Sequence, residues 1–141
     1  MEVKNYVLGE WISGEGVEID HIHAITGEII STTSSRGIDF SSLLEYGRKK
    51  GSSALRKMTF QQRGEMLKSL ALHLNKRKEV FYTLSKATGA TKIDSWIDID
   101  GGIGNLFANA SLRRQFPDLP YYIDGQMANL SKNGTFIGHH I

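Results

Sequence analysis

The stretch that decides the fold is residues 59–107, TFQQRGEMLKSLALHLNKRKEVFYTLSKATGATKIDSWIDIDGGIGNLF. Thr59 and Gln62 match the T-x-x-Q pattern of a capping box, in which each side chain satisfies a free backbone N–H of the other residue. Small and apolar residues then recur at steps of three and four, which predicts an amphipathic helix beginning after Thr59. These residues are Phe60, Gly64, Leu67, Leu70, Ala71 and Leu74.

Two more helices are predicted from the same stretch. A single helix reaching Thr88 would be unusually long, so we expect a bend or restart near Asn75–Glu79. Gly89 is a fitting stop for the second helix. The third helix begins near Thr91–Ser95 and runs to about Gln115, because Pro117 disfavours helical geometry at the residue before it.

The N-terminal region predicts strands. Between positions 17 and 25 apolar and histidine side chains fall on alternate positions, the period of a half-buried strand; these are Val17, Ile19, His21, His23 and Ile25. Thr26-Gly27-Glu28 is a turn signal, and residues 29–33 resume extended structure. A small antiparallel sheet within residues 3–32 is therefore expected.

The remaining segments complete an α+β fold. Residues 39–58 predict a helix that Gly47 and Gly51 weaken, each by about 1 kcal/mol relative to alanine. Residues 127–141 predict a strand with no partner in the chain. The expected regions are a β-hairpin region at 1–35, three to four helices at 38–116 and the C-terminal strand at 127–141.

Composition excludes several function classes. The 141 residues carry a net charge of only +2, which gives no support for nucleic-acid binding. The basic clusters at 48–50, 76–78 and 113–114 are diluted by nearby glutamates and predict solvated helix faces. There are no cysteines, which excludes a disulfide scaffold and a cysteine nucleophile within these residues. With no membrane-length apolar run and no signal peptide, we expect a cytoplasmic chain.

The candidate chemical groups are weak. Gly101-Gly102-Ile103-Gly104 resembles part of a phosphate loop, but it lies inside a helical pattern, which favours close helix packing. Asp94, Asp98 and Asp100 suggest a metal site, yet no His or Glu joins them at ligand spacing, so helix-start charge and a solvated or polar-lined face are favoured. Surface or structural roles are likewise favoured for the histidines, which are His21, His23, His73, His139 and His140.

Three segments carry a resemblance to a known family. MTFQQRGEMLKSLALHL, LSKATGATKIDSWIDIDGGIGNLF and LSKNGTFIGHHI, in that order, resemble the N-terminal region of an aldehyde dehydrogenase. More narrowly, the run from Thr88 to Gly104 resembles the phenylacetate-degradation branch, which couples the dehydrogenase to an oxepin-CoA hydrolase. The resemblance implies that the chain is an incomplete N-terminal part of the α/β aldehyde dehydrogenase fold.

The resemblance also implies a reaction and partners. In the family a cysteine thiolate attacks the aldehyde, hydride passes to NADP, and a glutamate activates the hydrolytic water. These groups and the main dinucleotide-binding loops lie beyond residue 141, so no catalytic, cofactor-binding or metal residue is assigned here. The expected partners are the remainder of the dehydrogenase domain, a CoA-linked semialdehyde and further copies, which residues 127–141 would join as the start of an oligomerisation arm.

Two alternatives to a plain scaffold remain open. The family's corresponding helix passes near the substrate tunnel, so Asp98, Gly101 and Gly102 could line its mouth and widen it for a CoA thioester. Alternatively, the chain is a small self-associating or partner-binding module without enzymatic activity.

Overall fold

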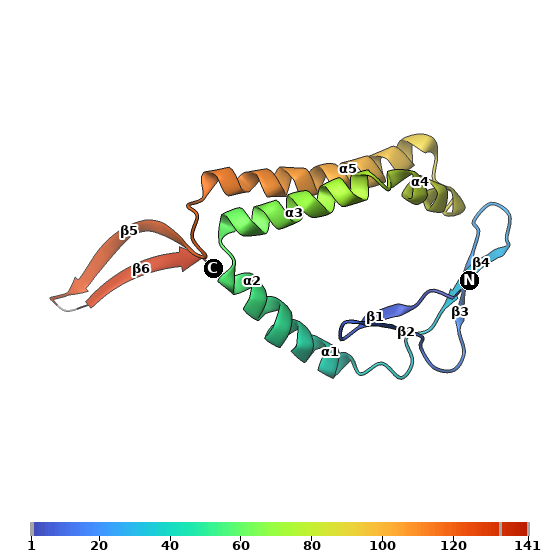
Figure 1. Ribbon diagram of the computed structural model, residues 1–141, viewed down its shortest axis with the longest axis horizontal. Helices are drawn as coiled ribbons and strands as arrows, with labels where there is room; N and C mark the ends of the chain where they lie inside the picture. The colour runs from blue at the N-terminus through green and yellow to red at the C-terminus, as the bar shows by residue number, and fades with distance from the viewer. Residues whose placement is uncertain (1, 133, 141) are drawn as a thin grey trace. The chain divides into compact units, whose positions relative to one another are not determined.

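The computed structural model describes residues 2–132 and 134–140. The chain divides into two compact units, one made of Met1–Gly51 and Arg77–Gly102 and the other of Ser52–Lys76 and Ile103–Ile141. Figure 1 shows helices and short β-hairpins, which confirms an α+β composition. Among the described residues, no helix is long and apolar enough to span a bilayer.

The first unit begins with two separate hairpins. β1 (Asn5–Val7) pairs with β2 (Glu10–Ile12), and β3 (Ile19–Ile22) pairs with β4 (Ile29–Thr33), both antiparallel. The prediction of one small sheet was therefore wrong, because the two pairs form independent two-stranded sheets.

The half-buried strand expected over residues 17–25 was also wrong. β3 covers only four of these positions and all four are exposed, with Ile19 68% and Ile22 59% accessible. The residues that follow β3 form the turn instead, where the His23 N–H donates to the Glu28 carbonyl over 2.8 Å. The alternating side chains of residues 17–25 therefore do not form a buried strand face in this structure.

The first predicted helix forms, but not as one regular α-helix. α1 (Phe40–Tyr46) begins at Asp39, whose carboxylate accepts the N–H groups of Ser41 and Ser42 over 2.9 and 3.1 Å. A π-helical segment (Gly47–Ser52) follows, and α2 (Ser53–Lys57) completes the run. The two glycines that weaken this helix both lie in the π-helical segment, and neither of them has a positive φ.

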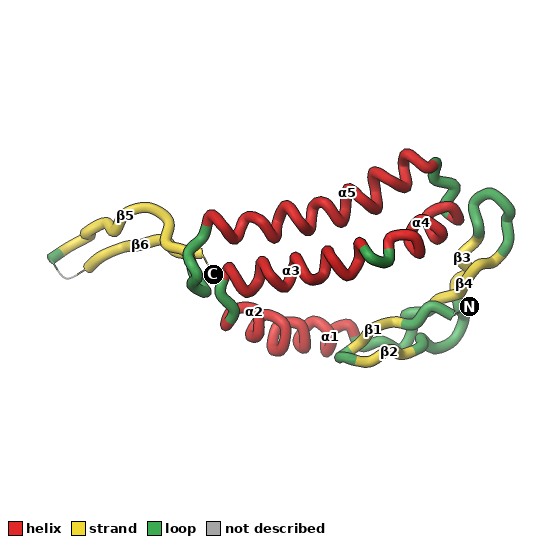
Figure 2. The backbone as a smooth tube through the Cα atoms, turned by 45° about the horizontal axis from the view of Figure 1, so that its top comes forward, coloured by secondary structure: helices red, strands yellow, loops and turns green. Residues whose placement is uncertain are grey.

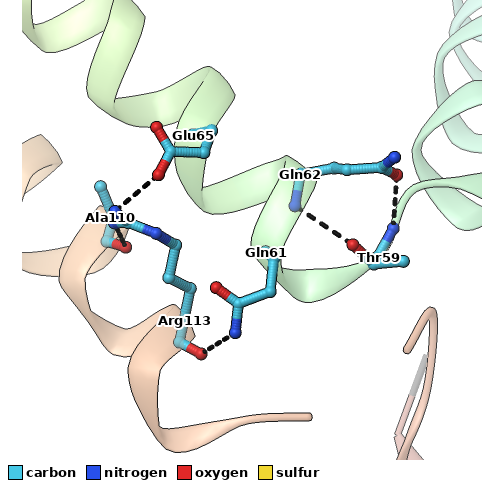
Figure 3. A network of polar contacts seen from close by, with 6 residues as sticks. All are labelled: Thr59, Gln61, Gln62, Glu65, Ala110 and Arg113. Atoms are coloured by element: carbon cyan, nitrogen blue, oxygen red, sulfur yellow. Dashed lines mark hydrogen bonds and ion pairs between the residues drawn. The ribbon is translucent and has the colours of Figure 1, made fainter. Parts of the chain in front are cut away.

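The central helices match the sequence patterns. α3 (Phe60–Asn75) begins at the predicted capping box, with the Gln62 N–H 3.2 Å from Thr59 Oγ1 and the Thr59 N–H 3.0 Å from Gln62 Oε1 (Figure 3). The chain restarts as α4 (Lys78–Ala87), which confirms the break. Gly89, at φ +81°, follows its C-terminus as predicted.

α5 (Lys92–Ser111) is the third predicted helix and continues into a 3₁₀ turn (Leu112–Gln115). Phe116 is extended, with φ −116° and ψ 150°, in agreement with the restriction that Pro117 imposes. Within the second unit, α3 and the part of α5 from Ile103 onward run side by side in both views (Figures 1 and 2). In the second unit this contact involves Gly64, Ala110 and Arg113.

Polar bonds hold the end of α5 against the start of α3. Gln61 Nε2 donates to the carbonyls of Arg113 and Phe116 over 2.8 and 3.1 Å. Arg113 pairs with Glu65 over 2.6 Å and donates to the Ala110 carbonyl over 2.7 Å (Figure 3). The rings of Phe60 and Phe116 stack at 4.7 Å. The Gln61 and Arg113 side chains thus bond backbone carbonyls at the C-terminal end of α5 and of its 3₁₀ turn, while the ion pair and the ring stack add side-chain contacts between the two segments.

The C-terminal region differs from its prediction. β5 (Tyr122–Ser131) pairs with β6 (Gly134–His140) as an antiparallel hairpin. The single unpartnered strand expected over residues 127–141 was therefore wrong, because this range contains the second half of β5, a turn at Lys132 and β6. Pattern inspection treated the first half of β5 as an irregular connection and missed this partner. Because consecutive strands usually pair, a strand so close in sequence is the natural neighbour of β6.

Candidate functional site

One group of polar side chains in the first unit lies between α4 and the first half of α5. Lys78, Tyr82 and Lys86 follow one another at four-residue steps, which places them on one face of α4. Hydrogen bonds join the two helices near both ends of α4, since Ser85 and Ser95 bond through their hydroxyls over 2.8 Å and Lys78 reaches Asp100 on α5.

Asp100 is the centre of this contact. Its carboxylate accepts one hydrogen bond from the Lys78 ammonium over 2.9 Å and another from the Tyr82 hydroxyl. The side chains of Lys78 and Asp100 are 36% and 24% exposed. Two donors on one carboxylate thus fix α4 to α5 at a partly sheltered position.

The contact moves each pKa away from neutrality. The hydrogen bond from Tyr82, followed by that from Lys78, lowers the pKa of Asp100. The hydrogen bond to Asp100 raises the pKa of Lys78 and raises the pKa of Tyr82 to about 12. None of the three groups therefore changes its protonation state near pH 7, and general acid–base catalysis there is disfavoured. The chemistry of this cluster is ion pairing and positioning.

The three aspartates of the suggested metal site have different environments. Asp94 caps the start of α5: its carboxylate accepts from the Thr91 hydroxyl over 2.6 Å, and its N–H donates back to Thr91 over 3.2 Å. Asp98 is exposed, and Asp100 is engaged by α4. Within residues 2–132 and 134–140 no group of three potential ligands is placed to hold a metal. The predicted helix-start position fits Asp94, which the structure shows to be part of the cap, and the predicted polar-lined face fits Asp100.

The glycine run lies in the interior of α5, as its helical pattern predicted. Backbone N–H groups this far from a helix start are used by the helix, so Gly101–Gly104 do not fit a diphosphate cradle for NADP. A β-carbon added at Gly101, Gly102 or Gly104 would meet nothing within 4 Å. The expectation of close helix packing was therefore wrong for this part of the chain. The close approach occurs at Gly64 instead.

The histidines whose side chains are described form no cluster. His21 and His73 are exposed, while the His23 ring accepts the backbone N–H of Ile25 over 3.2 Å and so supports its own turn. His139 and His140 lie in β6, opposite Ile123 and Tyr122, and their side chains lie outside the described part of the structure.

A cavity of about 530 Å³ opens beside the Asp100 contact. It is lined by Lys78, Glu79, Tyr82, Lys86, Ala90, Lys92 and Ser95, and we call it the lysine pocket. The sequence pattern placed Lys78 in a basic cluster on a solvated helix face and gave no role to Lys86 or Lys92. The four-residue spacing of Lys78, Tyr82 and Lys86 could have indicated that they share one face of α4. It does not indicate which element packs against that face, because this depends on the turn between α4 and α5.

The three residues proposed to line the mouth of a substrate tunnel are accessible to solvent. Asp98, Gly101 and Gly102 lie on α5 and all three are exposed. Among the described residues, none lies within 4 Å of a β-carbon added at either glycine, so the space next to them is open.

Comparison with known proteins gives one informative match. The chain is 31% identical over 141 residues to the 3,4-dehydroadipyl-CoA semialdehyde dehydrogenase of Aromatoleum evansii. The alignment covers 99% of this chain and 27% of that protein, so the chain spans about a quarter of the relative's length. No protein-family model matches. The similarity supports a relationship to part of an aldehyde dehydrogenase.

Proposed function

We propose that the chain is a structural part of an NADP-dependent aldehyde dehydrogenase that oxidises a CoA-linked semialdehyde. The observation that carries this proposal is the 31% identity over 141 residues to a CoA semialdehyde dehydrogenase. The name of that relative supports the substrate class. The order of the three sequence segments that resemble aldehyde dehydrogenases gives separate support.

Within this proposal the chain is scaffold and the reacting groups come from other residues of the protein. The sequence has no cysteine to supply the thiolate of such a reaction. NADP, when bound, accepts the hydride; the glycine run of α5 does not fit it, so its site would be built by other residues. The task left for this chain is to present packed helices to the remainder of the domain.

Exposed apolar side chains on α5 support the scaffold role. Ile93 is 70%, Trp96 59% and Ile97 56% accessible. Exposed hydrophobic surface of this kind is typical of an interaction face. Burying one such side chain fully contributes about 1.5–3 kcal/mol, so packing against the rest of a dehydrogenase domain would stabilise both parts.

Three finer assignments belong to the same proposal. Phenylacetate degradation and an oxepin-CoA hydrolase partner domain are proposed on the resemblance of the run between Thr88 and Gly104 to that branch of the family. A homo-oligomer is proposed on the resemblance of residues 127–141 to the start of the family's oligomerisation arm. Asp98, Gly101 and Gly102 would line the tunnel mouth, and the open space beside the glycines is compatible with a bulky substrate.

The tunnel assignment has its own test. Gly101→Leu or Gly102→Leu in the complete enzyme should lower kcat/KM for the CoA-linked aldehyde more than for a small free aldehyde. An equal loss for both substrates would show that the substitution disturbs packing and not access.

The alternative function is an interaction module without enzymatic activity, and the exposed face of α5 is equally compatible with it. The nucleotide sequence downstream of the codon for Ile141 separates the two. We expect an open frame that encodes a cysteine-bearing dehydrogenase body. A stop codon directly after Ile141 in the natural gene would contradict the proposal and favour the module.

A further inference from the structure

The lysine pocket has a charge distribution that the proposed scaffold role does not use. Three of its lining residues are lysines, and Glu79 is its one acidic lining residue. Lys78 is already balanced by Asp100 over 2.9 Å. No ion pair in the described part of the chain includes Lys86 or Lys92. The excess positive charge is therefore carried by these two residues.

The positive and acidic residues occupy different ends of the pocket. Glu79 lies in the first turn of α4 and Lys86 in its last, seven residues away. At 1.5 Å per residue this separates them by roughly 10 Å along the helix. Lys92 and Ser95 line the pocket from the first turn of α5. The nearby Asp94 carboxylate is engaged by Thr91 in the helix cap.

We propose that the lysine pocket binds a phosphate-bearing small molecule of nucleotide size, with its phosphate at Lys86 and Lys92. Lysine ammonium groups are compact charges that suit phosphate oxygens. The Ser95 hydroxyl, which shares a 2.8 Å hydrogen bond with Ser85, can reorient to donate to the same anion.

The remainder of the pocket fits an organic body. The volume of about 530 Å³ lies within the range of small-molecule sites, roughly 300–1,000 Å³. The Tyr82 ring and the methylene stems of the lysines give this region an apolar wall. The hydrogen bond from Tyr82 to Asp100 fixes the ring, so the wall is formed before a ligand arrives. This inference concerns binding by this chain alone and does not depend on dehydrogenase activity.

Titration of the 141-residue chain tests the proposal. ADP, CoA, NADP and orthophosphate would be added separately, with calorimetry for affinity and ¹H–¹⁵N NMR for location. We expect at least one of the three nucleotides to bind more tightly than orthophosphate and to shift the amides of Lys86, Lys92 and Ser95. The nucleotide that binds most tightly identifies the source of the phosphate.

Matched variants locate the charge requirement. A charge-assisted hydrogen bond contributes about 1.5–3 kcal/mol, so Lys86→Gln and Lys92→Gln should each weaken binding roughly 10-fold or more. Lys57→Gln and Lys68→Gln change exposed lysines of the other unit and should alter affinity less than about twofold. Circular dichroism confirms that each variant is folded. Failure of all three nucleotides to bind, or equal losses in the pocket and control variants, would overturn the proposal.

Discussion

Gly64 is the position where the structure predicts that a helix-favouring substitution will be harmful. A β-carbon added there would lie 2.8 Å from the Cβ of Arg113 and 3.0 Å from the carbonyl oxygen of Ala110. Both atoms belong to or lie next to backbone, so they cannot move aside as the end of a flexible side chain can. Gly64→Ala therefore requires α3 to shift relative to α5.

The magnitude follows from two opposing effects. Replacing glycine by alanine inside a helix gains about 1 kcal/mol of helix propensity. Overpacking a close contact typically costs about 1–3 kcal/mol. Gly64→Ala should therefore lower the free energy of unfolding by up to about 2 kcal/mol, even though alanine is the better helix former.

Gly104 provides the matched control in the same unit. It lies in the interior of α5, and a β-carbon added there would meet nothing within 4 Å. Gly104→Ala should therefore raise the free energy of unfolding by about 1 kcal/mol. Urea denaturation of the 141-residue chain, followed by circular dichroism, measures both variants. If Gly64→Ala stabilises the chain as much as Gly104→Ala does, the close approach of α3 and α5 is refuted.

Three further predictions concern other contacts. Thr59→Ala should lower stability by about 1 kcal/mol in urea denaturation, because it removes an N-cap acceptor, while Thr59→Ser should retain most of it; equal losses would argue against the capping box. The Tyr82 phenol, isolated spectroscopically by difference against Tyr82→Phe, should ionise at a pKa of about 12, and Asp100→Asn should return its midpoint towards 10; an unchanged midpoint would exclude Asp100 as the cause. Because the pKa of Tyr82 is raised on folding, its contribution to the free energy of unfolding is complete below pH 10 and is lost as the pH rises from about 10 to 12. The pKa of Asp100 is lowered on folding, so its contribution is lost in acid, as the pH falls below the ordinary value of 3.8. In a Trp11→Phe background of the isolated chain, iodide should quench the fluorescence of Trp96, because its side chain is 59% exposed. Protection from iodide as complete as that of a buried tryptophan would contradict this exposure.

The helical framework could be predicted from sequence because its signals are local. Each signal affects only the backbone within one or two helical turns of its own position. The signals are the capping box at Thr59, Gly89 and Pro117. Their consequences are the start of α3, the end of α4 and the extended conformation of Phe116, and all three are confirmed.

The hairpins were predicted less accurately than the helices, because alternating apolar residues do not show whether one face of a strand is buried. Ile19 and Ile22 occupy positions typical of a half-buried strand, yet both are exposed. Strand pairing also depends on which segments meet. The predicted strand at 127–141 in fact contains the turn between β5 and β6, so the sequence pattern joined two paired strands into one.

The lysine pocket was unpredictable for a related reason. Lys78 and Asp100 are 22 residues apart, and their contact requires the chain to reverse between α4 and α5. The sequence places Asp100 on a helix with a polar side but does not show which lysine or tyrosine faces it. Only the packing of the two helices distinguishes this carboxylate from the exposed one of Asp98.

The central claim is that this chain supports an aldehyde dehydrogenase without supplying its reacting groups. The most direct test is reduction of NADP by a CoA-linked semialdehyde, measured in parallel for the purified 141-residue chain and for the full product of its gene. We expect NADPH formation with the full product and none with the chain alone. NADPH formation by the isolated chain would contradict the claim. So would a full gene product that forms neither NADPH from NADP nor NADH from NAD.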